Sequence, residues 1–447
     1  MRVAALVALS FWLAVAQARA QSLDEALGGF EEQAAPAAEA SRASASWVDV
    51  SGSLKLSGAY AFAHGAPSPG QPDWRGLNRL RARADAAVEA RPNERWRFKA
   101  AGKGLYDFAY ALKGRDDYTS AVLDEYESEL ELREAFVQGK LTESFDVTLG
   151  RQIVAWGKMD NLRVTDVLNP LDNREPGMVD IEDLREPLAI SKLDFYRGAW
   201  NLSLIAIHEI AFNKTAPFGG EFYTLPIAQP REETPASTLE NTEFAAALNG
   251  VFSGYDVSFY AANLYNDGPH GERVGAAPVM RHARLFMLGG AGAWVHGSWL
   301  VKAEAAWLDG LKFINVPERE FSRLDAALGL EYAGVTDHTF SFEGALRRMT
   351  GYDARIGGAP ELAEETEWQG ALRWQADFIH STLHSIALAG YTRGGRSWAF
   401  ERLQVTYDVN DAIKLTGGAV AYHSEKSAWF TGFEENDRLF LEGEYNF

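Results

Sequence analysis

Residues 79–89 read RLRARADAAVE and residues 95–108 read RWRFKAAGKGLYDF, and polar and apolar side chains alternate through both stretches. Successive side chains of a β-strand point to opposite faces, so a period of two predicts two strands, each with one charged and one apolar face. A soluble sheet buries its apolar face, whereas a membrane β-barrel turns that face to lipid and the polar face to its lumen. The row of charges on one face of both strands favours the barrel.

The two strands are predicted to form a hairpin with its turn at residues 91–94. Cross-strand neighbours on one face stabilise such a pair when their charges are opposite. The register that follows places Glu89 opposite Arg95, Asp85 opposite Lys99 and Arg81 opposite Lys103.

The last segment of the chain has the same pattern. Leu439, Leu441, Tyr445 and the final residue Phe447 share one face of a predicted strand. A terminal strand that ends on Phe resembles the signal by which the outer-membrane assembly machinery recognises its substrates. We therefore assign Tyr445 and Phe447 to that signal and expect the assembly machinery to be a partner.

Alternating segments recur from Trp47 to the end of the chain and predict an all-β transmembrane antiparallel barrel of about 18 strands, with 16 as the alternative, short periplasmic turns and longer extracellular loops. The predicted strands lie near residues 48, 77, 95, 126 and 438, and over residues 144–156, 188–197, 199–211, 242–252, 255–265, 283–295, 298–308, 323–333, 339–348, 366–378, 384–393, 398–407 and 412–423. Even parity places both chain ends on the periplasmic side.

Composition excludes several classes of protein. The 447 residues include no Cys, so disulfide scaffolds, thiolate metal sites and Cys nucleophiles are excluded. The 43 Lys and Arg against 62 Asp and Glu leave a net charge of −19, which argues against a nucleic-acid partner. The absence of Cys also suits an oxidising compartment such as the periplasm.

The first 46 residues differ from the rest. Residues 1–20 carry one early charge, an apolar run too short to span a bilayer and an Ala-Arg-Ala cleavage site, which indicates a secretory signal peptide. Residues 21–46 are acidic and then rich in Ala and Ser. Three interpretations stay open for them: a disordered periplasmic tail, a plug helix inside a pore, or a docking segment for a periplasmic partner.

A dense motif begins at Gly150: Gly-Arg-Gln at residues 150–152, Trp156-Gly157, Asp166 and Asn-Pro-Leu-Asp at residues 169–172. It resembles the G-R-Q-x-x-x-W-G…N-P-x-D element of an uncharacterised proteobacterial outer-membrane porin-like family, distantly similar to alginate-export-type porins. The likeness covers Leu27 to Phe30 and about residues 126–196. It implies an outer-membrane barrel that transports a solute, and it implies no catalytic residue.

The motif poses a problem of parity. Unbroken alternation through the strand that contains Leu149 would place Arg151 in lipid, which costs about 2–4 kcal/mol near the bilayer centre. We expect a β-bulge at Gly150 to turn Arg151 inward. The loop that follows, residues 157–187, either folds into the barrel as a charged constriction or stays outside, tied by its own salt bridges.

The predicted lumen and constriction residues are charged side chains on the inward faces and in this loop. They are Arg79, Arg81, Arg83, Arg95, Arg97, Lys99, Lys103, Glu127, Glu129, Glu131, Arg151, Asp160 and Arg163. The sequence has no nucleophile elbow, phosphate loop, His-Glu-x-x-His pattern or calcium-loop spacing, and His380 and His384, which have metal-like spacing, lie in a predicted turn. We therefore expect no enzyme activity, no catalytic residue, no cofactor and no metal site.

Two functions remain open. The first is a passive outer-membrane channel of a Gram-negative bacterium, through which small charged solutes diffuse past a charged constriction. The second is a transporter or exporter component for a hydrophobic substrate, with residues 21–46 as plug or dock. Expected partners are outer-membrane lipid and lipopolysaccharide, held in part by acidic loops, together with small solutes and either a second copy of the chain or a periplasmic protein.

Overall fold

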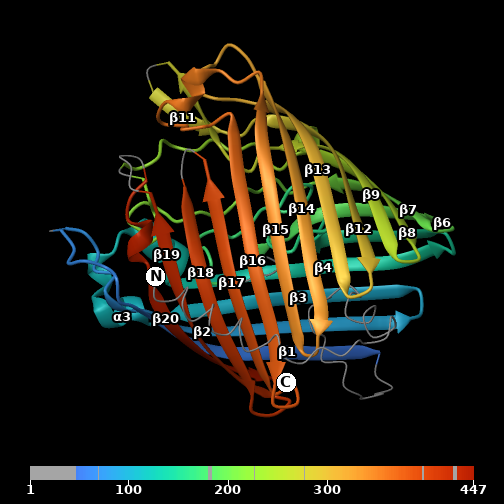
Figure 1. Cartoon of the computed structure of the whole chain (residues 1–447), viewed down its shortest axis with the longest axis horizontal. Coiled ribbons are helices and arrows are strands. Elements are labelled where there is room, and N and C mark those ends of the chain that lie inside the picture. Colours follow the sequence, from blue (N-terminus) through green and yellow to red (C-terminus); the bar gives the residue numbers. More distant parts are fainter. Residues whose placement is uncertain are drawn as a thin grey trace.

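The structure is a computed structural model that describes residues 47–68, 70–179, 184–225, 227–275, 277–394, 397–425 and 430–447. The predicted signal peptide at residues 1–20 and the predicted tail at residues 21–46 lie outside the described residues. Eighteen strands form one antiparallel sheet, and β1 pairs with both β2 and β20, which closes the sheet into a barrel (Figure 1). The predicted fold and the count of 18 are confirmed.

The barrel strands follow one another around the wall. They are β1 (Val48–Ala61), β2 (Gly76–Asn93), β3 (Trp96–Asp107), β4 (Ser128–Thr142), β5 (Phe145–Gln152), β6 (Leu188–Arg197), β7 (Trp200–Ile207), β8 (Glu243–Phe252), β9 (Tyr255–Tyr265), β12 (Arg284–His296), β13 (Trp299–Leu311), β14 (Phe321–Val335), β15 (His338–Thr350), β16 (Thr366–Phe378), β17 (Leu383–Arg393), β18 (Trp398–Asp408), β19 (Ile413–Ser424) and β20 (Arg438–Asn446). A separate hairpin, β10 (His270–Val274) and β11 (Ala277–Arg281), lies between β9 and β12 and was not predicted.

Helix is scarce in the described residues. Two short α-helices, α3 (Ala109–Lys113) and α4 (Ser120–Tyr126), precede β4, which therefore begins at Ser128. The Thr119 side chain caps α4 by accepting a hydrogen bond from the Val122 N–H. Four 3-10 turns complete the set: Arg115–Asp117, Leu239–Asn241, Ala354–Gly357 and Phe433–Glu435. In the described part of the chain no helix has the length and apolar character to span a bilayer.

The outer face of the barrel is apolar and exposed, as the alternation predicts. Leu130 of β4 is 92% exposed and Leu441 of β20 is 67% exposed. The neighbours of Leu130, Glu129 and Glu131, turn to the other face and contact Lys103 of β3. An apolar outside around a polar inside is the arrangement that lipid requires.

The two ends of the barrel differ. Short turns, such as Glu94–Arg95 and Gly297–Ser298, join strands at one end, where β1 begins and β20 finishes. Long segments, including residues 153–187 and 208–242, leave the other end. Short turns are periplasmic in barrels of this kind, so the long segments mark the extracellular end.

The β2–β3 register differs from the predicted one. Arg81 lies opposite Asp107, Asp85 opposite Lys103 and Glu89 opposite Lys99. The prediction was wrong because β2 continues to Asn93, so that the turn is only Glu94 and Arg95. The offset is even, and an even offset keeps each side chain on its predicted face.

The predicted bulge at Gly150 is also wrong. Gly150 pairs with Phe136 of β4 and Ile190 of β6, and neither register shifts there. Gly150 instead has φ +123°, a backbone conformation in which a residue with a side chain would be strained. A Cβ at this position would also lie 2.2 Å from the Ala135 carbonyl oxygen. A register shift does occur nearby, between β3 and the neighbouring strand β4, where Arg133 of β4 is the extra residue.

Candidate constriction inside the barrel

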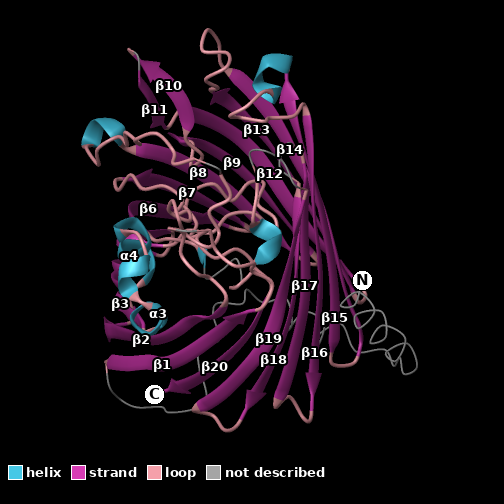
Figure 2. Ribbon diagram, turned by 90° about the vertical axis from the view of Figure 1, so that its left-hand side faces the viewer, coloured by secondary structure: helices cyan, strands magenta, loops and turns pink. Residues whose placement is uncertain are grey.

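The inner loop, of which residues 153–179 and 184–187 are described, crosses the interior of the barrel (Figure 2). At one wall Trp156 stacks on Tyr260 of β9, with ring centroids 4.7 Å apart. At the far wall the Pro176 carbonyl accepts a hydrogen bond of 2.8 Å from the Tyr422 hydroxyl of β19. Of the two interpretations of the loop, the structure therefore supports the one that folds into the lumen, and β5 ends early, at Gln152, because the chain turns inward there.

The first anchor of the inner loop is Glu304, midway along β13. Its carboxylate accepts backbone N–H groups of Met159 at 2.8 Å and Thr165 at 3.0 Å, and the Thr165 hydroxyl at 2.7 Å. The Lys158 N–H donates to the same carboxylate. One wall side chain thus satisfies four donors of a buried loop, which would otherwise be costly to desolvate.

The second anchor is Glu343 on β15. It accepts the backbone N–H groups of Asp160 at 2.7 Å, Asn161 at 2.9 Å and Leu162 at 2.9 Å. The Asp160 carboxylate in turn pairs with Lys302 of β13. The two glutamates therefore hold residues 158–165 against the wall near mid-barrel.

Motif residues tie the inner loop to itself. The Asn169 side chain accepts the Val154 N–H at 2.9 Å and donates to the Glu186 carbonyl at 2.8 Å. Asp166 accepts the Trp156 N–H at 3.2 Å and forms an ion pair with Arg163 at 3.2 Å. These motif positions shape the loop.

A second long segment, of which residues 208–225 and 227–242 are described, also reaches the lumen. Its Lys214 contacts Glu129 of β4 at 3.0 Å and Glu186 of the inner loop at 3.2 Å. The Asn213 side chain accepts the Leu171 N–H at 2.6 Å. Burial, together with the neighbouring Glu131, raises the pKa of the Glu186 carboxyl. The two loops thus form one charged layer across the barrel.

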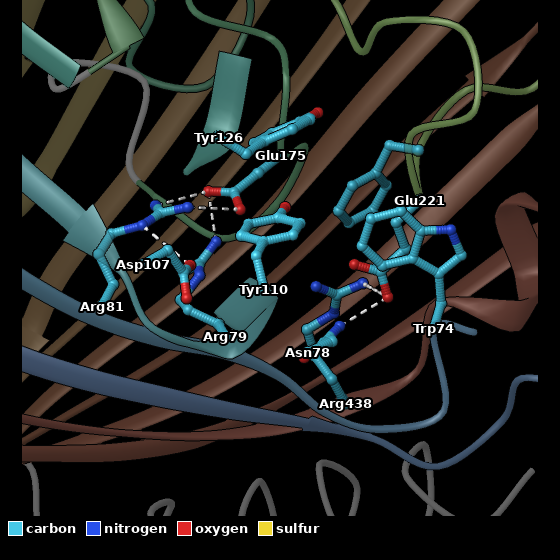
Figure 3. A pocket seen from close by; sticks show the side chains of 11 residues that line it. Trp74, Asn78, Arg79, Arg81, Asp107, Tyr110, Tyr126, Glu175, Glu221 and Arg438 are labelled. Carbon is cyan, nitrogen blue, oxygen red and sulfur yellow. Dashed lines mark hydrogen bonds and ion pairs between the residues drawn. The ribbon is translucent and has the colours of Figure 1, made fainter. Parts of the chain in front are cut away.

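The centre of this layer is the Glu175 carboxylate, which two arginines of β2 hold (Figure 3). Arg81 contacts Glu175 at 3.2 Å and Asp107 of β3 at 3.4 Å, and Arg79 forms an ion pair with Glu175 as well. Burial raises the pKa of Glu175, but Arg79 and Arg81 outweigh burial and hold that pKa below its usual range. Glu175 is therefore an anion at neutral pH.

Beside it the second loop contributes Glu221. This carboxylate contacts Arg438 of β20 at 3.0 Å and accepts a hydrogen bond of 2.6 Å from the Asn78 amide (Figure 3). It also lies 3.0 Å from the His64 ring. Burial opposes its charge, but Arg438 and His64 lower the pKa of Glu221. The free space among these side chains is about 10 Å³, roughly one water, so the cluster is closed to any larger solute.

The opposite side of the interior is mainly apolar, apart from inward charged side chains such as Glu304 and Glu343. Inward side chains of β6 to β9 and β12 to β15 pack on the inner loop, and they include Ile190, Ile207, Met287 and Leu308, each nearly or fully buried. Trp156 and Val164 of the loop belong to the same cluster. One half of the lumen is thus filled mainly by an apolar core, which encloses Lys302, Glu304 and Glu343, and charged side chains predominate in the other half.

Comparisons with known proteins agree with this geometry. A family model described as protein of unknown function DUF1302 matches residues 1–447. The chain belongs to the DUF1302 family. No curated protein matches it in sequence.

Solved structures show the same fold for this DUF1302 chain. OccAB1 of Acinetobacter baumannii is 10% identical, with 91% of this chain and 98% of that chain covered and a TM-score of 0.55. OccAB4 of the same organism is 11% identical over 90% and 98%, with a TM-score of 0.54. OpdK of Pseudomonas aeruginosa, solved with vanillate, is 11% identical over 89% and 98%, with a TM-score of 0.51. These solved structures share the barrel fold of this chain.

The DUF1302 structure places most predicted lumen residues inside, where they meet opposite charges. Arg83 pairs with Asp85, Arg97 with Glu89, Lys99 with Glu134, Lys103 with Glu131, Glu129 with Arg174 and Lys214, and Arg163 with Asp166. The basic stripe is therefore compensated along its length. Whether these side chains act on a solute stays a prediction.

Two of the predicted lumen residues, Arg95 and Glu127, lie outside the lumen. Arg95 is in the exposed periplasmic turn, because the true turn is Glu94–Arg95. Glu127 follows α4 at the extracellular rim and contacts Arg115 at 2.8 Å. Both predictions of a lumen position were wrong, since each rested on a strand boundary that a turn or helix displaced.

Arg151 reaches polar partners without the predicted bulge. Its guanidinium pairs with Glu209, donates to the Leu132 carbonyl at 2.8 Å and lies 3.9 Å from Glu131. Gly150 and the Arg133 bulge together account for this position. The terminal pair Tyr445 and Phe447 lies on the outer face with stacked rings, and its role in assembly stays a prediction.

Sequence reasoning missed the anchors Glu304 and Glu343 and the cluster residues Glu175, Glu221 and Arg438. A signal was present for the anchors, because each is an acid flanked closely by small or apolar residues, AEAAW and FEGAL. Among the described residues, no group of three or more His, Asp or Glu has the geometry to hold a metal.

Proposed function

We propose that the protein is an outer-membrane channel through which small charged solutes diffuse along the charged half of its lumen. A closed 18-stranded barrel is wide enough for an aqueous pore. The observation that carries the proposal is the charged layer that the inner loop and the second loop build across the barrel from Glu175, Glu221, Lys214 and their wall partners.

Ion pairs make up this charged layer. Buried carboxylates face the arginines of β2, so the layer presents neighbouring charges of both signs and selects by size and charge. OpdK, which shares the fold, was solved with vanillate, a small organic anion. We extend to this chain the class of small organic ions.

The second candidate is a transporter component for a hydrophobic substrate. The observation that favours it is the apolar inner half, where Ile190, Ile207 and Met287 face the inner loop. Displacement of the inner loop would expose an apolar path along β6 to β15. The predicted tail, residues 21–46, would then serve as plug or dock.

Planar-bilayer recordings test both candidates. The refolded protein from residue 21 and a version from residue 47 are each inserted, and conductance and reversal potential are measured in a salt gradient. Steady, charge-selective conductance in both supports the channel. Conductance only without residues 21–46 makes that segment a plug, and silence in both contradicts a passive channel and favours the hydrophobic substrate.

A further inference from the structure

A hollow on the outer wall lies across β14 to β17. Gly344 of β15 and Gly370 of β16 lie directly opposite each other on the outward face. The same row continues to Leu328 of β14 on one side and Tyr391 of β17 on the other. Both of those side chains are about half exposed, so two glycines form a floor between two tall walls.

The hollow is closed above and below as well. Trp368 lies on the next outward row toward the extracellular end and Phe342 on the next row toward the periplasm, and both are about half exposed. The groove so bounded has a volume of about 900 Å³. The strand registers beneath it run without a shift, so the groove does not pass through the wall.

A cation stands at the extracellular end of the groove. Arg393, the last residue of β17, pairs across the strands with Trp368 and is exposed. In the described part of the chain it has no ion-pair partner. Glu364 lines the same end and repels anions, so a phosphate is expected on the Arg393 side. Trp368 and Tyr391 supply the aromatic side chains that interfaces favour.

We propose that this groove binds a phosphorylated acyl lipid of the outer leaflet, lipid A in form. One acyl chain lies over Gly344 and Gly370, and Arg393 pairs with a headgroup phosphate. Arg393 at the outer-leaflet end complements the charge of a headgroup phosphate, which favours this lipid over a second copy of the chain as the occupant of the groove. The inference rests on the outer-membrane placement in the proposed function and does not depend on conduction.

The test is native mass spectrometry of the full barrel in detergent, titrated with lipid A. Arg393→Gln removes the cation and is expected to weaken binding about fivefold. Gly370→Leu fills the floor and is expected to abolish the bound-lipid peak. A Cβ at Gly370 meets Tyr391 at 3.5 Å, an ordinary contact, so the backbone accepts a side chain there and the variant is expected to fold.

The matched control is Gly417→Leu on the outer face of β19, where a Cβ meets Leu441 at 3.6 Å. It is expected to bind lipid A like the wild type. Equal binding by all variants would overturn the proposal. So would a dimer that Gly370→Leu converts to monomer while lipid A binding persists, because the occupant would then be a second copy. Conductance of Arg393→Gln is expected to be unchanged, so failure of the channel and failure of the lipid site are told apart.

Discussion

At the scale of single residues, the Glu175 carboxylate compensates two buried arginines of the wall. Arg79 and Arg81 both contact it, and Arg81 also contacts Asp107. A buried charge that loses its partner is expensive, so this carboxylate both closes the cluster and sets its net charge.

Glu175→Gln therefore adds one net positive charge to the layer. A unit charge is worth about 1 kcal/mol at 4 Å in water, so the anion-to-cation permeability ratio is expected to rise about fivefold. The reversal potential in a salt gradient measures it. Glu240→Gln, at an exposed position of the second loop, is the control and is expected to leave the ratio unchanged. An unaltered ratio in both would place the ion path away from Arg79 and Arg81.

Glu221 gives the second loop a dependence on acid. Its pKa is lowered from the usual 4.5, since Arg438 and His64 outweigh burial. The stabilisation is present above pH 4.5 and is lost as the pH falls through the folded pKa. Pepsin is expected to cut residues 208–242 only in that acidic range, whereas Glu221→Gln is cut above it as well. Cleavage of the wild type at pH 4.5 and above would contradict the ion pair.

Gly150 is a residue whose backbone only glycine adopts readily. Gly150→Ala is expected to cost more than about 1–2 kcal/mol, because it combines a left-handed φ with a Cβ at 2.2 Å from a carbonyl oxygen. Gly104→Ala is the control, since its Cβ meets Leu130 at 3.6 Å. The heat-modifiable folded band on gels measures the yield. Equal yields would show that β5 relaxes freely there.

At the scale of elements, two wall strands position the inner loop. Glu304 of β13 and Glu343 of β15 accept its N–H groups over residues 158–165. Hydrogen bonds to a charged group are worth about 1.5–3 kcal/mol each, so these carboxylates decide whether the loop stays on the wall.

Glu343→Gln replaces one accepting oxygen by a donor and is expected to loosen residues 160–162. Faster hydrogen exchange of those amides and a larger, noisier conductance are the readouts. Glu331→Gln on β14 is the control, because it also removes one carboxylate from the wall. Glu331 contacts Lys302 at 3.8 Å and does not accept the N–H groups of residues 160–162. If exchange stayed slow in Glu343→Gln, packing of Trp156 and Val164 would be the dominant anchor.

At the scale of the whole molecule, the lumen is divided. Charged side chains line the wall around β1 to β4, whereas β6 to β9 and β12 to β15 pack an apolar core on the inner loop. Charged side chains in the lumen therefore gather on one side of the barrel.

The absence of Cys makes this division measurable. Lys99→Cys, on the charged side, is expected to react with a charged, membrane-impermeant thiol reagent, because the Lys99 side chain is part-exposed in the lumen. Ala306→Cys, 1% exposed beneath the inner loop, is expected to be protected. Rapid labelling of Ala306→Cys would show that the inner loop leaves the wall and would support the hydrophobic-substrate function.

Local alternation by itself predicted the barrel, its strands to within a few residues with 18 or 16 as their number, and the face that most side chains take. An error of an even number of residues in the register leaves each side chain on its predicted face. Arg81, Asp85 and Lys103 therefore face the lumen although their pairing was predicted wrongly. Only the tertiary structure decided where residues 153–187 go, since their N–H groups are satisfied by Glu304 and Glu343, more than a hundred residues away. The apolar inner half escaped prediction for the same reason: a strand apolar on both faces shows no period, and its inner face is buried only once the loop has folded against it.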